Sequence, residues 1–325
     1  MNEILHRLWI GAAVPLFHPF SPSERIYWLY MVSSYLLAFF VFLLDASLRT
    51  GGRGGFWGYA FPKSVYLHPS AVLDYAYFLV YKMFFFLIVV PFLITDDSVR
   101  NFFSGAFGKI HAPLALAAPP GAAATVLYSL AAFMVADFGI FLAHYLQHKV
   151  PVLWEFHKVH HSAEVLTPIT VYRMHPVDDI LTATLVSAFA GGFDAAWNFV
   201  FQGGSHPAML MGVNLFTFGY YLFGYNLRHS HVWLSYGPAV SRVFISPAQH
   251  QIHHSAAKEH VDKNIGFVFS FWDMAAGTLC IPDRKMDIQF GLRHGEEKEY
   301  NSLARLFFLP FVKTARLFTK RRSAV

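Results

Sequence analysis

The chain has 325 residues, of which 55% are apolar, 18% aromatic and only 14% charged, with a formal net charge of +5. This composition excludes an ordinary soluble domain and favours a membrane protein. The positive charge could suit a nucleic acid, but basic residues beside apolar segments more often mark a cytoplasmic membrane face, so we expect no nucleic-acid partner.

Five apolar segments are long enough to cross a bilayer of about 30 Å as helices that rise about 1.5 Å per residue. They comprise residues 26–46, 73–95, 122–148, 180–201 and 207–228. The second carries Lys82 near its middle, which is costly in lipid unless the ammonium group faces protein or reaches the interface. Near the C-terminus, the apolar residues and cations of 305–318 predict a helix on the membrane surface.

The order of these segments predicts which side of the membrane the polar parts occupy. If the third span ends near His148, residues 149–179 lie on that side. A hairpin of the fourth and fifth spans, turning at 203–207, then returns the chain to the same side at His229. Of the 25 Lys and Arg residues, 17 fall at or after residue 149, which indicates that this side is cytoplasmic.

We therefore expect an all-α, multi-pass integral membrane protein with about four or five transmembrane helices. A cytoplasmic helical cap would carry a histidine-rich dinuclear metal site. Three regions are predicted: an N-terminal membrane region with two spans at 1–121, a catalytic domain at 122–282, and a basic, partly amphipathic tail at 283–325.

Histidines are concentrated in one part of the chain, since 13 of the 18 lie between residues 144 and 260. HYLQH places His144 and His148 four residues apart, on one helical face at the end of the third span. HKVHH at 157–161 follows Pro151, which can start a new helix, and puts three imidazoles on one side. The motif HQIHH at 250–254 repeats that spacing.

The second HxxHH motif has a recognisable helix start. Ser246 is placed as an N-cap, Pro247 as the first helical residue, and Gln249 as the reciprocal capping partner. Together with NLRHSH, which contains His229, the motifs supply eight or nine imidazoles, more than one metal ion binds, so the count predicts two metals. Cys280 is the only cysteine, which excludes a cysteine-rich zinc site. Nitrogen-rich sites with open positions suit iron and oxygen chemistry, but the residues alone leave iron and zinc open.

The motifs HYLQH, HKVHH, NLRHSH and HQIHH, with HPVDD at 175–179 and DKNIGFVFSFWDMAAGT at 262–278, resemble those of the membrane-bound sterol desaturase and fatty acid hydroxylase superfamily. The resemblance covers about residues 122–282. It implies a di-iron centre at the cytoplasmic membrane surface that uses O2 and external electrons. Its reaction would hydroxylate or desaturate a C–H bond of a lipid, either a sterol, a fatty-acyl chain or a related lipid.

The resemblance also implies which residues hold the two iron ions. The implied metal ligands are His144, His148, His157, His160, His161, His229, His250, His253 and His254. His175, His231 and His260 are further candidates for a ligand or for a hydrogen-bond partner of one, and no catalytic group beyond the metal ligands is expected.

Carboxylates and amides usually orient metal-ligating histidines through the second ring nitrogen. Asp137 lies seven residues before His144 on the same helical face, and Asn226 lies three residues before His229. Asp178, Asp179 and Asp273 are further candidates. A helix cap or a salt bridge remains the alternative role for each of these residues.

The sequence shows no cytochrome b5-like haem segment and no flavin or NAD fingerprint. We therefore expect a separate electron-transfer protein, of the ferredoxin or cytochrome b5 type with a reductase, and the basic face would suit an acidic carrier. Two alternatives stay open. A zinc-dependent hydrolase or isomerase is disfavoured because no HExxH arrangement is present. A non-enzymatic metal-binding membrane protein, such as a transporter, would need polar residues along the spans.

Overall fold

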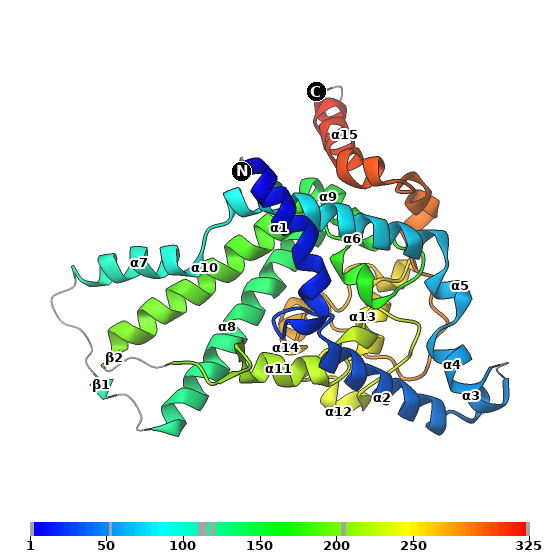
Figure 1. The fold of residues 1–325 in the computed structure, drawn as a ribbon, viewed down its shortest axis with the longest axis horizontal. Helices are drawn as coiled ribbons and strands as arrows, with labels where there is room; N and C mark the ends of the chain where they lie inside the picture. Colours follow the sequence, from blue (N-terminus) through cyan, green and yellow to red (C-terminus); the bar gives the residue numbers. More distant parts are fainter. Residues whose placement is uncertain (1–2, 52–53, 110–115, 118–120, 203–205, 323–325) are drawn as a thin grey trace.

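The computed structural model describes residues 3–51, 54–109, 116–117, 121–202 and 206–322 (Figure 1). The first half of this described part is helical. It contains α1 Glu3–Phe17, η1 His18–Phe20, α2 Trp28–Leu44, α3 Ala46–Gly51, α4 Gly55–Ala60, α5 Lys63–Tyr66, α6 Pro69–Ile88, η2 Val90–Phe92 and α7 Asp96–Phe107.

The second half is also mainly helical, with very short strands. It contains β1 Leu116–Ala117, α8 Ala122–Lys149, α9 Pro151–His161, η3 Pro168–Tyr172, α10 Pro176–Val200, β2 Phe201–Gln202, β3 Met209–Leu210, β4 Val213–Asn214, α11 Leu215–Leu222, η4 Tyr225–Leu227, α12 Gly237–Val240, α13 Pro247–His253, η5 Lys258–His260, α14 Phe271–Ala276, η6 Arg293–Glu299 and α15 Leu303–Arg322. Strands β1 and β2 pair in parallel, and β3 and β4 pair antiparallel. The predicted all-α class is confirmed.

Three helices of the described part, α6, α8 and α10, are long and apolar enough to cross a membrane. They correspond to the predicted spans at 73–95, 122–148 and 180–201. The predicted span at 26–46 forms α2, which is apolar but has only 17 residues. The protein is an integral membrane protein, and the cytoplasmic side of its polar part stays a prediction.

The prediction of a fifth span at 207–228 is wrong. The segment forms the β3–β4 hairpin, with Met209 opposite Asn214, and then α11, which has eight residues. The chain turns again at Gly224, whose φ of 88° is left-handed and stops the helix. Hydropathy detected the apolar residues but not these turns. In the predicted turn at 203–207, residues 203–205 lie outside the described residues.

The helices α8 and α10 pack closely side by side, and α7 packs on α10 (Figure 1). A Cβ at Gly139 of α8 would lie 2.9 Å from the Cα of Val186 in α10, so only glycine allows this approach. Since the two helices are connected through α9, the C-terminal end of α8 lies beside the start of α10. Gln147 of α8 thereby donates to the carbonyl of Asp178.

A buried ion pair ties α6 to the end of α9. Arg173 Nη1 lies 2.7 Å from Asp74 Oδ1, and both side chains are almost completely buried. The same guanidinium donates to the hydroxyl of Ser162 and to the carbonyl of Val159. Asp74 also accepts from Thr170. These contacts fix the C-terminal end of the helix that carries HKVHH.

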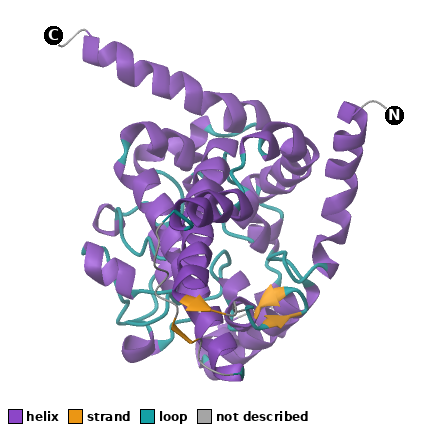
Figure 2. Ribbon diagram, turned by 90° about the vertical axis from the view of Figure 1, so that its left-hand side faces the viewer, coloured by secondary structure: helices purple, strands orange, loops and turns teal. Residues whose placement is uncertain are grey.

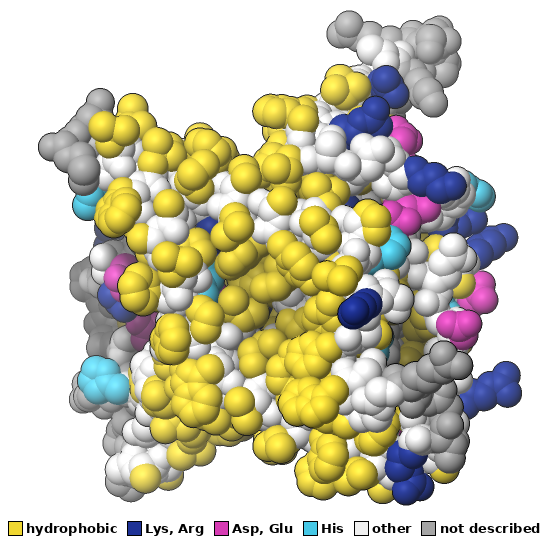
Figure 3. Space-filling model, turned by 45° about the vertical axis from the view of Figure 1, so that its right-hand side comes forward, with side chains coloured by type: hydrophobic (Ala, Val, Ile, Leu, Met, Phe, Trp, Pro, Cys, Tyr) yellow, Lys and Arg dark blue, Asp and Glu magenta, His cyan; other side chains and the backbone are white. Residues whose placement is uncertain are grey.

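The tail helix α15 covers α9 with its first turns and then extends away from the rest of the structure (Figure 2). Phe311 packs on Phe156 of α9, and Leu306 is buried. The segment predicted to lie on the membrane surface is thus helical, and Phe308 and Phe318 are exposed. Figure 3 shows a largely apolar face that is hollowed near its centre, with most charged groups along its upper and right-hand margins. Such a face suits contact with lipid.

Candidate metal centre

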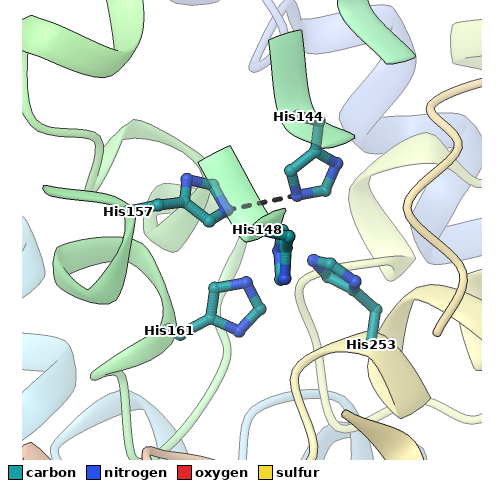
Figure 4. Close-up of side chains that lie close together, drawn as sticks. All are labelled: His144, His148, His157, His161 and His253. Carbon is teal, nitrogen blue, oxygen red and sulfur yellow. Dashed lines mark hydrogen bonds between the residues drawn. The ribbon is translucent and has the colours of Figure 1, made fainter. Parts of the chain in front are cut away.

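The nine histidines predicted as ligands come together in two groups. The first imidazole group consists of His144, His148, His157, His161 and His253 (Figure 4). The second imidazole group consists of His160, His229, His250 and His254. Within each group, one nitrogen atom per residue lies within 4.8 Å of all the others. The structure therefore places the predicted set around two centres.

Each HxxHH motif is divided between the two groups. On α9, His157 and His161 belong to the first group and His160 belongs to the second. On α13 the division is reversed: His253 joins the first group, and His250 and His254 join the second. The sequence interpretation put three imidazoles of each motif on one side of a helix. In the structure, positions i and i+4 serve one centre and position i+3 serves the other.

Local sequence explains how the two helices are set in place. Pro151 is the first residue of α9, directly after α8 ends at Lys149, so the chain changes direction between His148 and His157. The start of α13 has the predicted capping box, because the side chain of Ser246 accepts from Gln249 N and that of Gln249 accepts from Ser246 N.

Several imidazole nitrogens converge at distances typical of metal ligands. His144 Nε2 lies 3.1 Å from His157 Nε2 in the first group. In the second group, His229 Nε2 lies 3.3 Å from His160 Nε2 and 3.1 Å from His250 Nε2. His250 Nε2 is also 3.2 Å from His254 Nε2. Two ligands about 2.1 Å from one ion are separated by about 3.0 Å at a right angle and about 3.4 Å in a tetrahedron.

Hydrogen bonds between the rings do not account for this convergence. An imidazole Nε2 has either one proton or one lone pair, so His229 Nε2 can satisfy only one of its two close nitrogens. In the first group, Nε2 of His148, His161 and His253 is buried with no hydrogen-bond partner among the described residues. Buried polar atoms are rarely left without partners, so the donor set fits a metal ion at the centre of each group.

Burial keeps these imidazoles neutral. Desolvation lowers the pKa of His253 to about 3, and it lowers the pKa of His157, His229 and His254 well below the usual value. Neighbouring imidazoles lower the pKa of the latter three further. The neutral ring is the form that binds a metal, so the environment prepares the residues for that role at neutral pH.

Outer partners orient the rings of the first group. The Nδ1–H of His144 donates to the carbonyl of Ile265 (2.6 Å), and that of His253 donates to the carbonyl of Lys263 (2.9 Å). His148 Nδ1 lies 3.2 Å from Asp262 Oδ1, and His157 Nδ1 lies 3.4 Å from Asp178 Oδ2. Each contact places the proton on Nδ1 and leaves the Nε2 lone pair for the centre. The contact of Asp178 agrees with its predicted role.

Two buried carboxylates hold the segment that provides these carbonyls. Asp273 accepts from the N–H groups of Ile265 and Gly266. Asp137 accepts from Val268 N, Phe269 N and the indole Nε1 of Trp272. Asp137 thus does not bond to a ligand histidine directly. It positions the backbone at Val268 and Phe269, a few residues after the carbonyl that orients His144.

We expect Asp137→Asn to destabilise the protein by about 1–3 kcal/mol, because an amide NH2 group would replace an oxygen that accepts buried N–H groups. The metal content should remain unchanged, since no imidazole loses its partner. Unfolding in detergent, followed by fluorescence, measures the first effect, and metal analysis measures the second. Loss of metal at unchanged stability would show that Asp137 acts on the centre itself.

Five other predicted positions lie outside both groups. His175 caps α10, since its Nδ1 accepts from Val177 N, and its Nε2–H donates to the carbonyl of Phe307 in α15. His231 Nε2–H donates to the carbonyl of Tyr59. Asn226 donates to the carbonyl of Arg25, and His260 is buried as the last residue of η5. Asp179 accepts from Tyr81 rather than from a histidine.

Sequence reasoning missed four contacts of the centre. Asp262, whose own φ is 56°, contacts His148. Its position at the start of the DKN motif was a signal that sequence reasoning could have used. The carbonyls of Ile265 and Lys263 could not be recognised from the sequence, because every residue has a backbone carbonyl. Arg228 Nη2 lies 3.0 Å from His250 Nδ1. A cation therefore faces the outer nitrogen of one second-group ring, which makes the two groups electrostatically different.

Residues 129–278 match the model of the fatty acid hydroxylase family, and all nine histidines of the two groups fall within this stretch. Residues 129–278 belong to the fatty acid hydroxylase family. The match lies inside the predicted catalytic region 122–282, whose exact limits stay a prediction.

The chain is similar to several curated proteins. It is 29% identical over 163 residues to an ornithine lipid hydroxylase of Rhizobium tropici (49% of this chain, 44% of that protein). It is 27% identical over 163 residues to human alkylglycerol monooxygenase (50% and 32%). It is 26% identical over 153 residues to a Delta(7)-sterol 5(6)-desaturase of Gibberella zeae (47% and 38%). The chain spans less than half the length of these relatives, and no solved structure matches it.

A cavity of about 430 Å³ lies against the imidazole groups of this fatty acid hydroxylase region. Its imidazole lining comes from both groups and consists of His144, His157, His160, His229 and His250. Apolar lining comes from all three long apolar helices: Phe85 of α6, Ile140 of α8 and Val186 of α10. An apolar molecule in this cavity would reach both centres at once.

Proposed function

We propose that the chain is an O2-dependent membrane oxygenase that binds two iron ions in the two imidazole groups and hydroxylates or desaturates a C–H bond of a lipid. The observation that carries this proposal is the division of nine neutral imidazoles into two groups that share one largely apolar cavity. Nitrogen-rich sites with room for further ligands suit iron and oxygen chemistry.

The relatives support a lipid substrate. Their names describe the hydroxylation of an ornithine lipid, the monooxygenation of an alkylglycerol and the desaturation of a sterol. These reactions differ in product, but each acts on a lipid. We propose that this chain shares the substrate class, and the cavity between α6, α8 and α10 provides lateral access for a lipid tail.

The contribution of the protein is positioning. A bound pair of iron ions would supply the chemistry that activates O2 for the oxidation of an unactivated C–H bond. The carbonyls of Ile265 and Lys263 and the carboxylates of Asp178 and Asp262 fix the ligand rings. Phe85, Ile140 and Val186 exclude water from the substrate side and hold the tail against His144 and His157.

Metal analysis and lipid mass spectrometry test the proposal together. Purified protein should contain about two irons per chain, and lipids from cells that produce it should include a product that gains one oxygen or loses two hydrogens. The variant with His148→Ala and His161→Ala should not form this product, whereas His231→Gln should. Two zinc ions per chain without an oxidised lipid would overturn the proposal in favour of a zinc enzyme or a metal-binding protein.

We also propose that a separate ferredoxin or cytochrome b5-type protein delivers the electrons. If the carrier is acidic, attraction to the basic half of the chain speeds its association, and this attraction is screened by salt. We expect turnover with a ferredoxin donor to fall several-fold between low and high ionic strength. Turnover with dithionite is the control and should change little. Equal salt dependence with both donors contradicts the steering of the carrier by charge.

A further inference from the structure

One side of the cavity is charged although the rest of its lining is largely apolar. Four ionisable side chains line this side: Glu24, Arg25, Lys82 and Asp179. Lys82 interacts electrostatically with the other three, so they form one cluster, which we call the charged side of the cavity. Nothing in the arrangement of the two imidazole groups requires these side chains.

The two carboxylates of the charged side already have partners within the protein. Glu24 Oε2 accepts from the hydroxyl of Tyr172 at 3.2 Å and lies 3.1 Å from His18 Nδ1. Asp179 accepts from the hydroxyl of Tyr81. Because both carboxylates already accept hydrogen bonds from the protein, neither requires a cationic group of a ligand as its partner.

The two cations of the charged side are not paired in this way. Among the described residues, no carboxylate oxygen lies within 4.0 Å of the side-chain nitrogens of Arg25 or Lys82. The ammonium group of Lys82 instead lies over the rings of Phe85 and Tyr172, at 5.2 and 5.1 Å from their centroids. Glu24 and Asp179 act on these cations from a distance, but no carboxylate contacts them directly. Half-buried cations without a direct contact to an anion are costly beside an apolar cavity, so the site favours an anionic ligand between them.

Arg25 is fixed close to the second imidazole group. It lies in the short segment between η1 and α2, and its carbonyl accepts from Asn226 Nδ2 at 3.0 Å. Asn226 precedes His229 by three residues, and Arg25 interacts electrostatically with His229. The buried amide of Asn226 therefore positions the cation next to the proposed metal centre.

Apolar side chains line the rest of the cavity. Phe85, Val89 and Leu93 line it from the end of α6 onward, and Ile140 and Val186 line it from α8 and α10. His144 and His157 of the first group lie along the same cavity. A molecule that fills it would place a charged end at Arg25 and an apolar chain beside His144.

We propose that the cavity binds a lipid with an anionic head group, a carboxylate or a phosphate, which lies between Arg25 and Lys82 while its tail extends between α6, α8 and α10. This proposal rests on the proposed oxygenase function and names its substrate class. Glu24, Arg25 and Lys82 lie outside the residues 129–278 that match the family. The N-terminal region, and not the family region, selects the head group.

The test is equilibrium binding to the purified, metal-containing protein in micelles of a neutral detergent. The probes share an oleoyl or oleyl tail and differ in the polar end: N-oleoylglycine, oleoyl lysophosphatidate, monooleoylglycerol and oleylamine. We expect the chain to bind the better of the two anionic lipids about tenfold or more tighter than monooleoylglycerol, since a charge-assisted contact is lost with the neutral lipid. A comparison of the two anions distinguishes carboxylate from phosphate.

Variants assign the preference to the two cations. Arg25→Gln and Lys82→Met should each reduce the preference for the anion several-fold, whereas Arg242→Gln is the matched control, because Arg242 is exposed and does not line the cavity. Lys82→Glu should shift the preference toward oleylamine, a result that partial unfolding does not produce. Metal content, measured for each variant, shows whether the imidazole groups remain intact.

Equal binding of monooleoylglycerol and both anions, or a preference unchanged in Arg25→Gln and Lys82→Met, overturns the head-group site. Oxidation of the neutral lipid by the same preparation would then leave the oxygenase function in place. Conversely, anion-selective binding that depends on Arg25 and Lys82, in a protein that oxidises none of the probes, supports the head-group site and contradicts the proposed function.

Discussion

Replacing His229 and His254 together by alanine is expected to remove one of the two metal ions and to leave the other bound. Both residues belong to the second imidazole group, which would keep only His160 and His250, while the first group keeps all five rings. Replacing His148 and His161 should remove the other ion for the same reason. Turnover should fall at least about 100-fold in either variant, because loss of an oriented metal ligand costs at least as much as loss of its hydrogen-bond partner.

Metal analysis per chain is the direct measurement, and lipid oxidation is the second. His175→Gln is the matched control, because this histidine is also buried but bonds to Val177 and Phe307 and belongs to neither group. It should retain two ions. A protein that loses both ions in each double variant, or neither ion in both, contradicts the assignment of the nine histidines to two separate sites.

Arg173→Met is expected to destabilise the protein by about 3–5 kcal/mol. The substitution leaves the Asp74 carboxylate buried without its cation, and it removes the donors to Ser162 and to the carbonyl of Val159. Because those two contacts fix the end of α9, the variant should also bind metal more weakly than the unaltered chain. Unfolding in detergent, with and without added iron, measures both effects.

The control for this prediction is Arg7→Met. Arg7 pairs with Glu3 four residues earlier and donates to the carbonyl of Phe86, but the ion pair is exposed, so its loss should cost only about 0–1 kcal/mol. If Arg173→Met costs no more than Arg7→Met, then the buried pair does not stabilise the connection between α6 and the histidine helix.

The sequence predicted the features that depend on composition and local spacing. Apolar length identified α6, α8 and α10, and the spacing in HYLQH and the two HxxHH motifs identified eight of the nine histidines. The ninth, His229, was expected from the resemblance of NLRHSH to the family. The capping pattern identified the start of α13. Each of these properties is contained in a short stretch of chain, so tertiary structure is not needed to recognise it.

The features that sequence reasoning missed depend on distant contacts or on backbone conformation. The prediction of a fifth span was wrong because a turn at Gly224 interrupts the apolar segment, and hydropathy does not reveal this turn. Asp137 was recognised as a buried carboxylate with a role, but its partners are backbone N–H groups more than 130 residues away. The division of each HxxHH motif between two centres depends on how α9 and α13 face each other.

That division has a geometric consequence for the proposed pair of metal ions. His160 and His161 are neighbours on α9, and adjacent residues of an α-helix point about 100° apart, so each serves a different centre. On α13, His253 and His254 do the same in the reverse order. The spacing of two ions held by these rings would therefore be set twice, by the angle between neighbouring residues at the end of α9 and at the end of α13. A one-residue insertion or deletion within either HxxHH motif would rotate the following rings away from both ions, whereas the loops between the motifs can vary in length.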